Sequence, residues 1–144
     1  MNYLDSSAIV KRFVKEQGSE RVRRIIEEEG PIATAKIAYA EIHSGLARKK
    51  HERNLAPAEY DRICRRFELD WLAYVRLELT DDVLSLAREL IRRYPLRAFD
   101  AIHLASALIL RENLGEPITF AGADERQLQA AAHEKLSPLN VETG

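Results

Sequence analysis

Leu96-Arg97-Ala98-Phe99-Asp100-Ala101-Ile102-His103-Leu104-Ala105-Ser106-Ala107-Leu108-Ile109-Leu110 is rich in alanine and leucine and apolar on nearly every side. This pattern predicts a helix that other elements cover on all faces. An unpaired carboxylate near the start of such a helix costs several kcal/mol or takes up a proton. Asp100 therefore requires a hydrogen-bonding partner, a cation or a metal ion, and the function depends on which of these it has.

The composition is that of an ordinary globular protein. The 144 residues are 46% hydrophobic and 31% charged with a net charge of −1, so one domain over residues 1–144 is expected. The single Cys64 excludes a disulfide framework and a four-cysteine zinc site. The longest near-apolar run, Ala101 to Leu110, is too short to cross a bilayer, and no signal segment is apparent. A cytoplasmic protein without membrane association is expected. The net charge gives no general argument for nucleic-acid binding, which would depend on local clusters such as Arg48-Lys49-Lys50, Arg65-Arg66 and Arg92-Arg93.

Short apolar segments alternate with helical ones along the chain. The patterns predict strands at residues 1–4, 32–35, 72–79 and 118–121 and a possible fifth at 139–141. Helices are predicted after residue 5, then at 20–29, 37–50, from 57 onward, from 80 to 94, from 96 to about 114, and at 124–134. Strands joined through helices imply a parallel sheet that is covered on both faces, an α/β fold.

Acidic residues follow the predicted strands. Asp5 comes directly after the first strand, Asp124 just after the fourth, and Glu41 a few residues after the second. Ligands in such folds bind beyond the carboxyl ends of the strands. Carboxylates that converge there with Asp100 would repel one another unless they bind protons or a metal ion. Oxygen ligands suit Mg²⁺ or Mn²⁺, which activate water and hold phosphoryl oxygens during phosphodiester hydrolysis.

Each acid also has a purely structural interpretation. Asp5 can accept hydrogen bonds from the amides of the next helix, and Glu41 can be a solvated helix residue. Asp124, three residues before Gln127, fits a capping box. His103 lies on the same helix face as the acid three residues before it and is a candidate metal ligand or general base. A core histidine that bonds to the backbone is the favoured interpretation.

Other polar residues near these acids are assigned supporting roles. Ser6 and Ser7 are interpreted as helix caps or as auxiliary hydrogen-bond donors to the site. His43 follows the acid at position 41 by two residues, so it is expected to point elsewhere on its helix.

Four segments carry a combined pattern that is more specific than any one of them. They are Asp5-Ser6-Ser7-Ala8-Ile9-Val10-Lys11, Ala40-Glu41-Ile42, Leu96 to Ala105, and Phe120-Ala121-Gly122-Ala123-Asp124-Glu125-Arg126-Gln127-Leu128. In this order and spacing they resemble the PIN-domain ribonucleases, and among these the VapC toxins of bacterial and archaeal toxin–antitoxin pairs. The resemblance spans the whole chain.

The resemblance implies a three-layer α/β/α fold whose central parallel sheet has about four to five short strands. It also implies a Mg²⁺- or Mn²⁺-dependent endoribonuclease that acts on RNA, forms a homodimer and is held inactive by a VapB-like antitoxin. Asp5 and Asp100 match the principal metal ligands, Glu41 completes the shell directly or through water, and Asp124 sits at a second metal or orients water. Many relatives have Ser or Thr where this chain has Gly122, which removes a hydroxyl from the rim.

Three other functions stay open on the sequence. They are a PIN-type nuclease of RNA processing, a phosphatase or phospho-accepting receiver, and a non-catalytic partner-binding domain whose acids only cap helices. The phosphatase or receiver is disfavoured because no second acid follows Asp5 by two residues and because Asp100 opens a helix instead of ending a strand. A capping-only protein would gain no thermal stability from Mn²⁺, whereas a metal site would.

Overall fold

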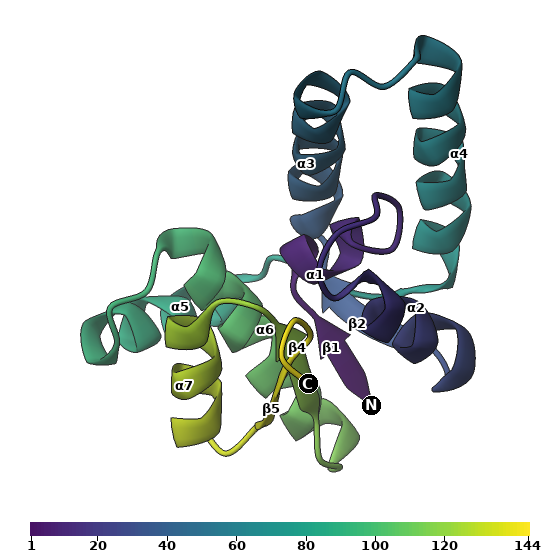
Figure 1. Ribbon diagram of the computed structural model, residues 1–144. Coiled ribbons are helices and arrows are strands. Elements are labelled where there is room, and N and C mark those ends of the chain that lie inside the picture. The colour runs from purple at the N-terminus through teal and green to yellow at the C-terminus, as the bar shows by residue number, and fades with distance from the viewer.

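Strands and helices alternate along the chain in a computed structural model that describes all 144 residues (Figure 1). The elements are β1 (Asn2–Leu4), α1 (Ser6–Val10), α2 (Ser19–Glu28), β2 (Ile32–Ala35), α3 (Ala38–Glu52), α4 (Pro57–Ala73), β3 (Val75–Leu77), α5 (Asp81–Arg93), α6 (Ala98–Leu114), β4 (Thr119–Gly122), α7 (Glu125–His133) and β5 (Ser137–Asn140). The five strands form one sheet in the order β3-β2-β1-β4-β5, and every neighbouring pair is parallel. The parallel sheet predicted from the alternating pattern is confirmed.

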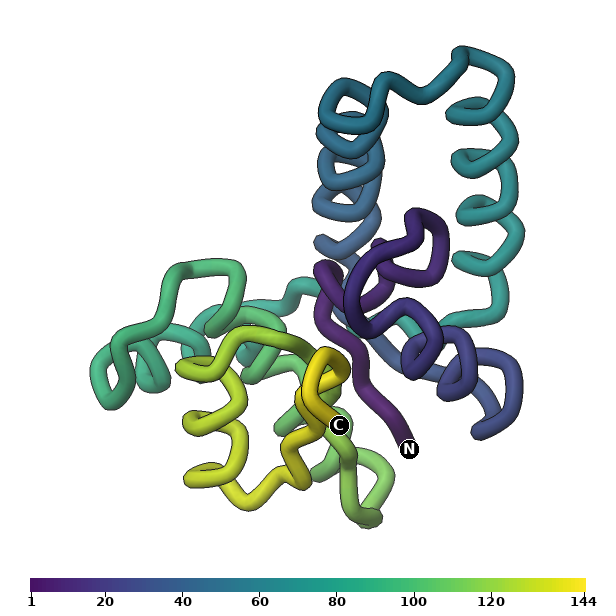
Figure 2. The backbone as a smooth tube through the Cα atoms, in the orientation of Figure 1, coloured from purple at the N-terminus to yellow at the C-terminus, as the bar shows by residue number.

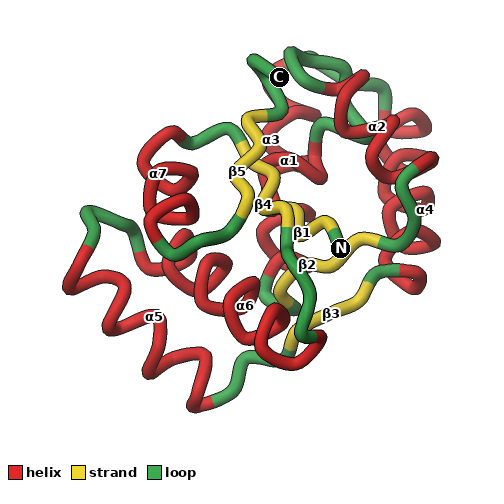
Figure 3. The backbone as a smooth tube through the Cα atoms, turned by 90° about the horizontal axis from the view of Figure 1, so that it is seen from below, coloured by secondary structure: helices red, strands yellow, loops and turns green.

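Helices cover both faces of this sheet. Helices α1 to α4 pack against one face and α5 to α7 against the other, and Figure 2 shows β1 running between the two groups. Successive strand residues point to opposite faces, so Tyr3 enters the core shared with α6 while Leu4 enters the core shared with α1 and α3. Viewed from below, the strands lie in the middle with helices around them (Figure 3). The three-layer α/β/α fold is confirmed.

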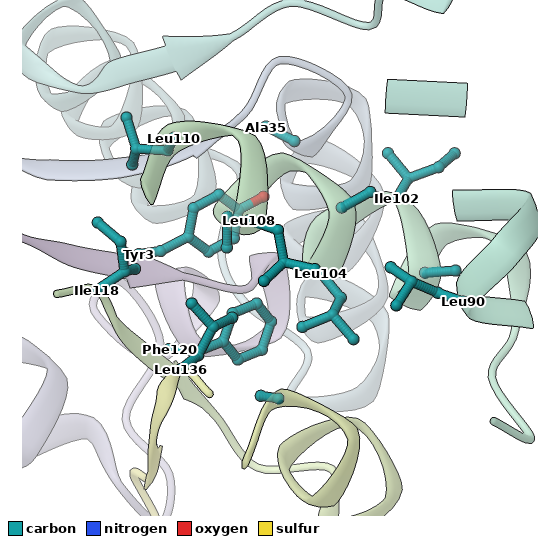
Figure 4. Packing of buried hydrophobic residues seen from close by; sticks show 14 of the residues in the cluster. Tyr3, Ala35, Leu90, Ile102, Leu104, Leu108, Leu110, Ile118, Phe120 and Leu136 are labelled. Atoms are coloured by element: carbon teal, nitrogen blue, oxygen red, sulfur yellow. The ribbon is translucent and has the colours of Figure 1, made fainter. Parts of the chain in front are cut away.

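Helix α6 is the anchor of one core. Every residue from Ala101 to Leu108 is buried, as the apolar pattern predicted. The helix packs beside the stacked rings of Tyr3 and Phe120, whose centroids are 5.4 Å apart (Figure 4). Gly115 ends it in the left-handed conformation at φ 65°, which a residue without a side chain adopts at little cost. The first turn of α6, which carries Asp100, is therefore held by a rigidly packed helix.

The largest difference from the predicted elements lies at β3. The alternating pattern predicted a strand over residues 72–79, but α4 continues to Ala73 because Phe67 and Trp71, one turn apart, keep the same buried face. The remaining strand, Val75–Leu77, lies at an edge of the sheet, and Val75 and Arg76 are exposed. No helix in the structure is both long enough and apolar enough to span a membrane.

Two smaller differences concern local boundaries. Helix α2 starts one residue before the predicted segment, at Ser19, and its cap is Gly18. The Ser19 hydroxyl accepts a hydrogen bond from the Glu16 amide and donates one to the Val14 carbonyl. Strand β5 starts two residues before the predicted segment, where Ser137 pairs with Thr119 of β4.

Candidate active site

One edge of the sheet collects the four predicted acids from four parts of the chain. Asp5 is the N-cap of α1, Glu41 and Asp100 lie in the first turns of α3 and α6, and Asp124 is the N-cap of α7. Two clefts flank the acids: Glu41 lines one of about 680 Å³, while Asp100 and Asp124 line one of about 520 Å³. The parallel topology therefore brings these carboxylates to a common edge.

Asp5 is fixed by the sheet and by a serine. Its amide donates a hydrogen bond to the carbonyl of Ala121 in β4 at 3.0 Å, which continues the β1–β4 pairing. The Ser7 hydroxyl donates to Oδ2 of the carboxylate at 2.6 Å, and Oδ1 lies 3.6 Å from Nε2 of His103. Asp5 occupies the N-cap position of α1, but its carboxylate accepts no hydrogen bond from a backbone amide. The interpretation that its side chain caps the helix is therefore wrong. Ser6 and Ser7 lie inside α1 and do not cap it, and Ser7 is instead the auxiliary donor.

His103 joins this acid to Glu41. The imidazole is completely buried; its Nδ1 lies 2.8 Å from the Tyr3 hydroxyl and its Nε2 lies 2.7 Å from Oε1 of Glu41. Because an ionised carboxylate only accepts hydrogen bonds, Nε2 is the nitrogen that carries the proton toward Glu41. The prediction of a histidine bonded to the backbone is wrong, and so is the interpretation of Glu41 as a purely solvated residue. Both ring nitrogens bond side chains that lie 100 and 62 residues away in the sequence.

The surrounding acids favour the charged form of this imidazole. Burial lowers the pKa of His103, but the hydrogen bond with Glu41 and the negative charges of Asp5, Glu41 and Asp100 outweigh burial and raise its pKa above the ordinary value. When it is protonated, His103 offsets part of the repulsion among the carboxylates.

The negative charge of Asp100 is less well neutralised by its neighbours. Arg97, one turn earlier, places its Nε 3.6 Å from Oδ2 of Asp100 and its Nη2 3.9 Å from Oδ2 of Asp124. The Arg97 side chain is 87% exposed, so solvent screens most of its attraction. Burial of the carboxyl, followed by the charges of Asp5 and Asp124, raises the pKa of Asp100. This part of the site therefore holds more negative charge than its neighbours neutralise.

Asp124 both caps a helix and borders the site. Its Oδ1 accepts hydrogen bonds from the amides of Arg126 at 2.9 Å and Gln127 at 3.3 Å, which confirms the predicted cap. The Gln127 side chain does not complete a capping box; it is buried, and its Nε2 donates to the backbone carbonyl of Asp100 at 3.3 Å. Its Oε1 has no partner and lies 3.5 Å from where a Cβ at Gly122 would be. The hydroxyl that Gly122 lacks would sit beside this unpaired acceptor.

The donor set at this edge fits a hard divalent cation. It consists of carboxylate oxygens with no thiol among them, which is the chemistry that Mg²⁺ and Mn²⁺ prefer. The raised pKa of Asp100 marks an excess of negative charge that such a cation would relieve. As the side chains stand, no three of them are gathered tightly enough to hold a metal ion. The acids instead contact His103 and Arg97.

The other predicted polar groups divide between the site and the rest of the surface. His43 points away from the acids, as expected, and its Nε2 lies 3.1 Å from Oε1 of Glu68 on α4. Arg48 and Lys49 line the larger cleft, so this basic cluster flanks the site. Arg66 lines a separate cleft beside α2 and α4, and Arg93 pairs with the Glu134 carboxylate.

Three residues at the site carried no prediction from the sequence. Tyr3 showed only the apolar pattern of a strand, and nothing marked its hydroxyl as the partner of a distant imidazole. The spacing of three residues between Arg97 and Asp100 was the one signal that they could pair on a helix. Phe99 belonged to an otherwise apolar segment, yet it is 56% exposed and lines the larger cleft.

Comparisons with known proteins agree with this geometry. The family model described as PIN domain matches residues 3–133. Ribonuclease VapC45 of Mycobacterium tuberculosis is 33% identical over 131 residues, covering 91% of this chain and 88% of that protein. Ribonuclease VapC46 of the same organism is 36% identical over 135 residues, covering 90% and 88%. The structure of a toxin–antitoxin complex from Klebsiella pneumoniae superposes with a TM-score of 0.66 at 15% identity and covers 98% of both chains. The chain therefore belongs to the PIN domain family and, within it, to the VapC group.

Proposed function

We propose that this protein is a metal-dependent endoribonuclease of the VapC kind, a toxin that hydrolyses RNA phosphodiesters. The observation that carries the proposal is the convergence of carboxylates from four separate elements at one sheet edge, beside two open clefts: Asp5, Glu41, Asp100 and Asp124. Relatives of similar length that are named ribonucleases support RNA as the substrate.

Mg²⁺ or Mn²⁺ is the cofactor that this donor set favours. Asp5 and Asp100 would be its principal ligands, Glu41 would complete the shell directly or through water, and Asp124 would hold a second ion or orient water. When bound, the ion supplies an activated water and neutralises charge on the phosphoryl oxygens. The Oδ1 of Asp124 is occupied by capping, so its Oδ2 is the oxygen left for this task.

The neighbouring side chains hold these acids in position. The His103 imidazole bonds Glu41, and its second nitrogen is fixed by the Tyr3 hydroxyl, so the ring cannot rotate without breaking both hydrogen bonds. The Ser7 hydroxyl holds one oxygen of Asp5. Such outer hydrogen bonds orient ligands and usually matter nearly as much as the ligands themselves.

The proposed partners follow from the same family. A VapB-like antitoxin would block the activity, a possibility supported by a structural neighbour that is a toxin–antitoxin complex. The proposal further includes a homodimer of chains that each form one PIN domain over residues 1–144 and act on RNA in the cytoplasm.

Incubation of the purified chain with total RNA tests the activity. We expect cleavage with Mn²⁺ or Mg²⁺, none with EDTA, and none by Asp5→Asn or Asp100→Asn at an unchanged circular-dichroism spectrum. Asp61→Asn is the matched control, because this exposed acid on α4 forms no ion pair and should keep full activity. Full activity of both site variants would refute the proposal.

The remaining alternatives give different results in the same preparation. A non-catalytic module would neither cleave RNA nor gain melting temperature from Mn²⁺. A nuclease of RNA processing would cleave RNA, but its expression without an antitoxin would not arrest growth.

A further inference from the structure

Phe99 is an aromatic side chain in an unusual place. It lies in the first turn of α6, directly before Asp100, and is 56% exposed, although the helix behind it is almost entirely buried. It takes part in none of the aromatic pairs of the molecule. Packing therefore does not account for this ring, and its backbone is held by a well-anchored helix.

The ring lines the cleft of about 680 Å³ that also contains Glu41. This volume is in the range of clefts that bind small organic ligands. Small side chains of α3 form part of its wall, among them Ala40, Ser44 and Gly45. A Cβ at Gly45 would lie 3.0 Å from Cγ2 of Val10, so glycine lets α1 approach α3 closely at this point.

A free cation lies on the α3 side of the cleft. Arg48 is exposed and forms no ion pair, and its Nη2 lies 3.8 Å from the Cβ position of Gly45. Lys49 is already engaged, since its Nζ lies 2.7 Å from Oε2 of Glu16. The cleft thus combines one unpaired guanidinium, one exposed ring and, through Glu41 on α3, the edge of the acidic site.

We propose that Phe99 is the stacking platform for a nucleobase of single-stranded RNA next to the phosphodiester at the acids, and that Arg48 binds a phosphate on the far side of this base. The inference rests on the proposed function, because it assigns a subsite of the same cleft. Single-stranded RNA presents its bases to aromatic rings, and stacking tolerates different bases because each has a π-face. Guanidinium groups bind phosphate oxygens in a bidentate manner.

Binding of fluorescent oligoribonucleotides to the full chain tests this subsite. The probes are a short oligoadenylate and an oligomer of the same length with abasic riboses, measured by anisotropy in EDTA at low salt. Phe99→Leu, which keeps apolar bulk but removes the ring face, should weaken oligoadenylate binding by about 5-fold to 150-fold. It should leave abasic binding unchanged, and Phe99→Trp should restore oligoadenylate affinity.

Arg48→Gln should weaken both probes alike and lower the slope of log affinity against log salt by about 0.7. Leu69→Ser is the control for an exposed apolar residue outside the cleft, since Leu69 is 70% exposed on α4. Equal losses on both probes, unchanged affinity of Phe99→Leu, or no binding by the wild type would overturn the inference. So would a change in sedimentation of Phe99→Leu, which would place the ring in a protein interface.

Cleavage of the oligoadenylate and of total RNA with Mn²⁺ separates this inference from the proposed function. Base-dependent binding through Phe99 without any cleavage would overturn the nuclease and support the stacking platform. Cleavage with an unaffected Phe99→Leu variant would overturn the platform alone.

Discussion

Removing the His103 imidazole should strongly destabilise the metal-free protein. His103→Ala breaks the hydrogen bond to Glu41, of the charge-assisted kind that contributes about 1.5–3 kcal/mol, and the bond to Tyr3, of the neutral kind that contributes about 0.5–1.5 kcal/mol. It also leaves the Tyr3 hydroxyl buried without its partner and a cavity where the ring packed. The free energy of unfolding should therefore fall by about 3–5 kcal/mol, a large part of the roughly 5–15 kcal/mol typical of a domain.

The loss should depend on pH with a definite sign. The pKa of His103 is raised in the folded protein, so its charged form contributes stability that is fully present below the unfolded pKa of about 6.5 and is lost as pH rises through the folded pKa. Urea unfolding followed by circular dichroism in EDTA, at about pH 6 and about pH 9, should show a smaller difference between wild type and variant at the higher pH.

Two variants sharpen this measurement. His51→Ala removes an exposed histidine at the end of α3 and should change stability by no more than about 0.5 kcal/mol. Tyr3→Phe should cost less in the His103→Ala background than in the wild type, because the two side chains share a hydrogen bond. A loss below about 1 kcal/mol for His103→Ala, or a loss independent of pH, would refute the reasoning.

Three further substitutions test other features of the fold and site. Asp100→Asn should raise the melting temperature in EDTA at neutral pH, because a carboxyl whose pKa is raised by folding destabilises the protein while it is ionised. The variant should also lack the rise in melting temperature that the proposed metal site would give the wild type in Mn²⁺. A fall in EDTA on differential scanning fluorimetry would contradict this reasoning. Gly122→Ser should raise the melting temperature by up to roughly 4 °C, since the serine hydroxyl can donate a hydrogen bond to Oε1 of Gln127. A melting temperature below that of the wild type would show that the added atoms do not fit. Gly18→Ala should lower the free energy of unfolding by about 1–3 kcal/mol more than Gly30→Ala. Both glycines have φ near 90°, but only at Gly18 would the Cβ lie 2.9 Å from a backbone carbonyl oxygen. Equal losses of the two variants in urea titrations would refute this.

The order of elements was predictable because it depends on local patterns. The continuous apolar run of α6 predicted a helix covered on all sides, and the short apolar segments predicted strands that need crossover helices. The predicted strand over residues 72–79 is too long, because Leu72 and Ala73 fit an alternating pattern as well as a helical one. Packing of Phe67 and Trp71 against the same core decided for the helix.

The acids of the site were predictable, but their partners were not. Asp5 and Asp124 follow strands, and topology alone places such residues at the carboxyl edge of a parallel sheet. The Tyr3–His103–Glu41 chain depends on the register between β1 and α6 and on where α3 crosses the edge, which no local pattern encodes. The sequence therefore predicts only a backbone partner for His103, whereas the folded structure gives it two side-chain partners.

The topology also explains how one edge can tolerate four carboxylates. Each of the acids lies at the N-terminal end of a helix, as the N-cap of α1 or α7 or in the first turn of α3 or α6. The partial positive charge of such an end favours an acid by about 0.3–1 kcal/mol, and a parallel α/β fold directs these ends to the carboxyl edge of its sheet. With His103 and Arg97 added, the pKa of Asp100 is still raised, so the compensation is incomplete. A divalent cation that binds here would remove the remaining repulsion between the carboxylates. Its binding would therefore stabilise the folded protein, which couples metal affinity to the stability of the fold.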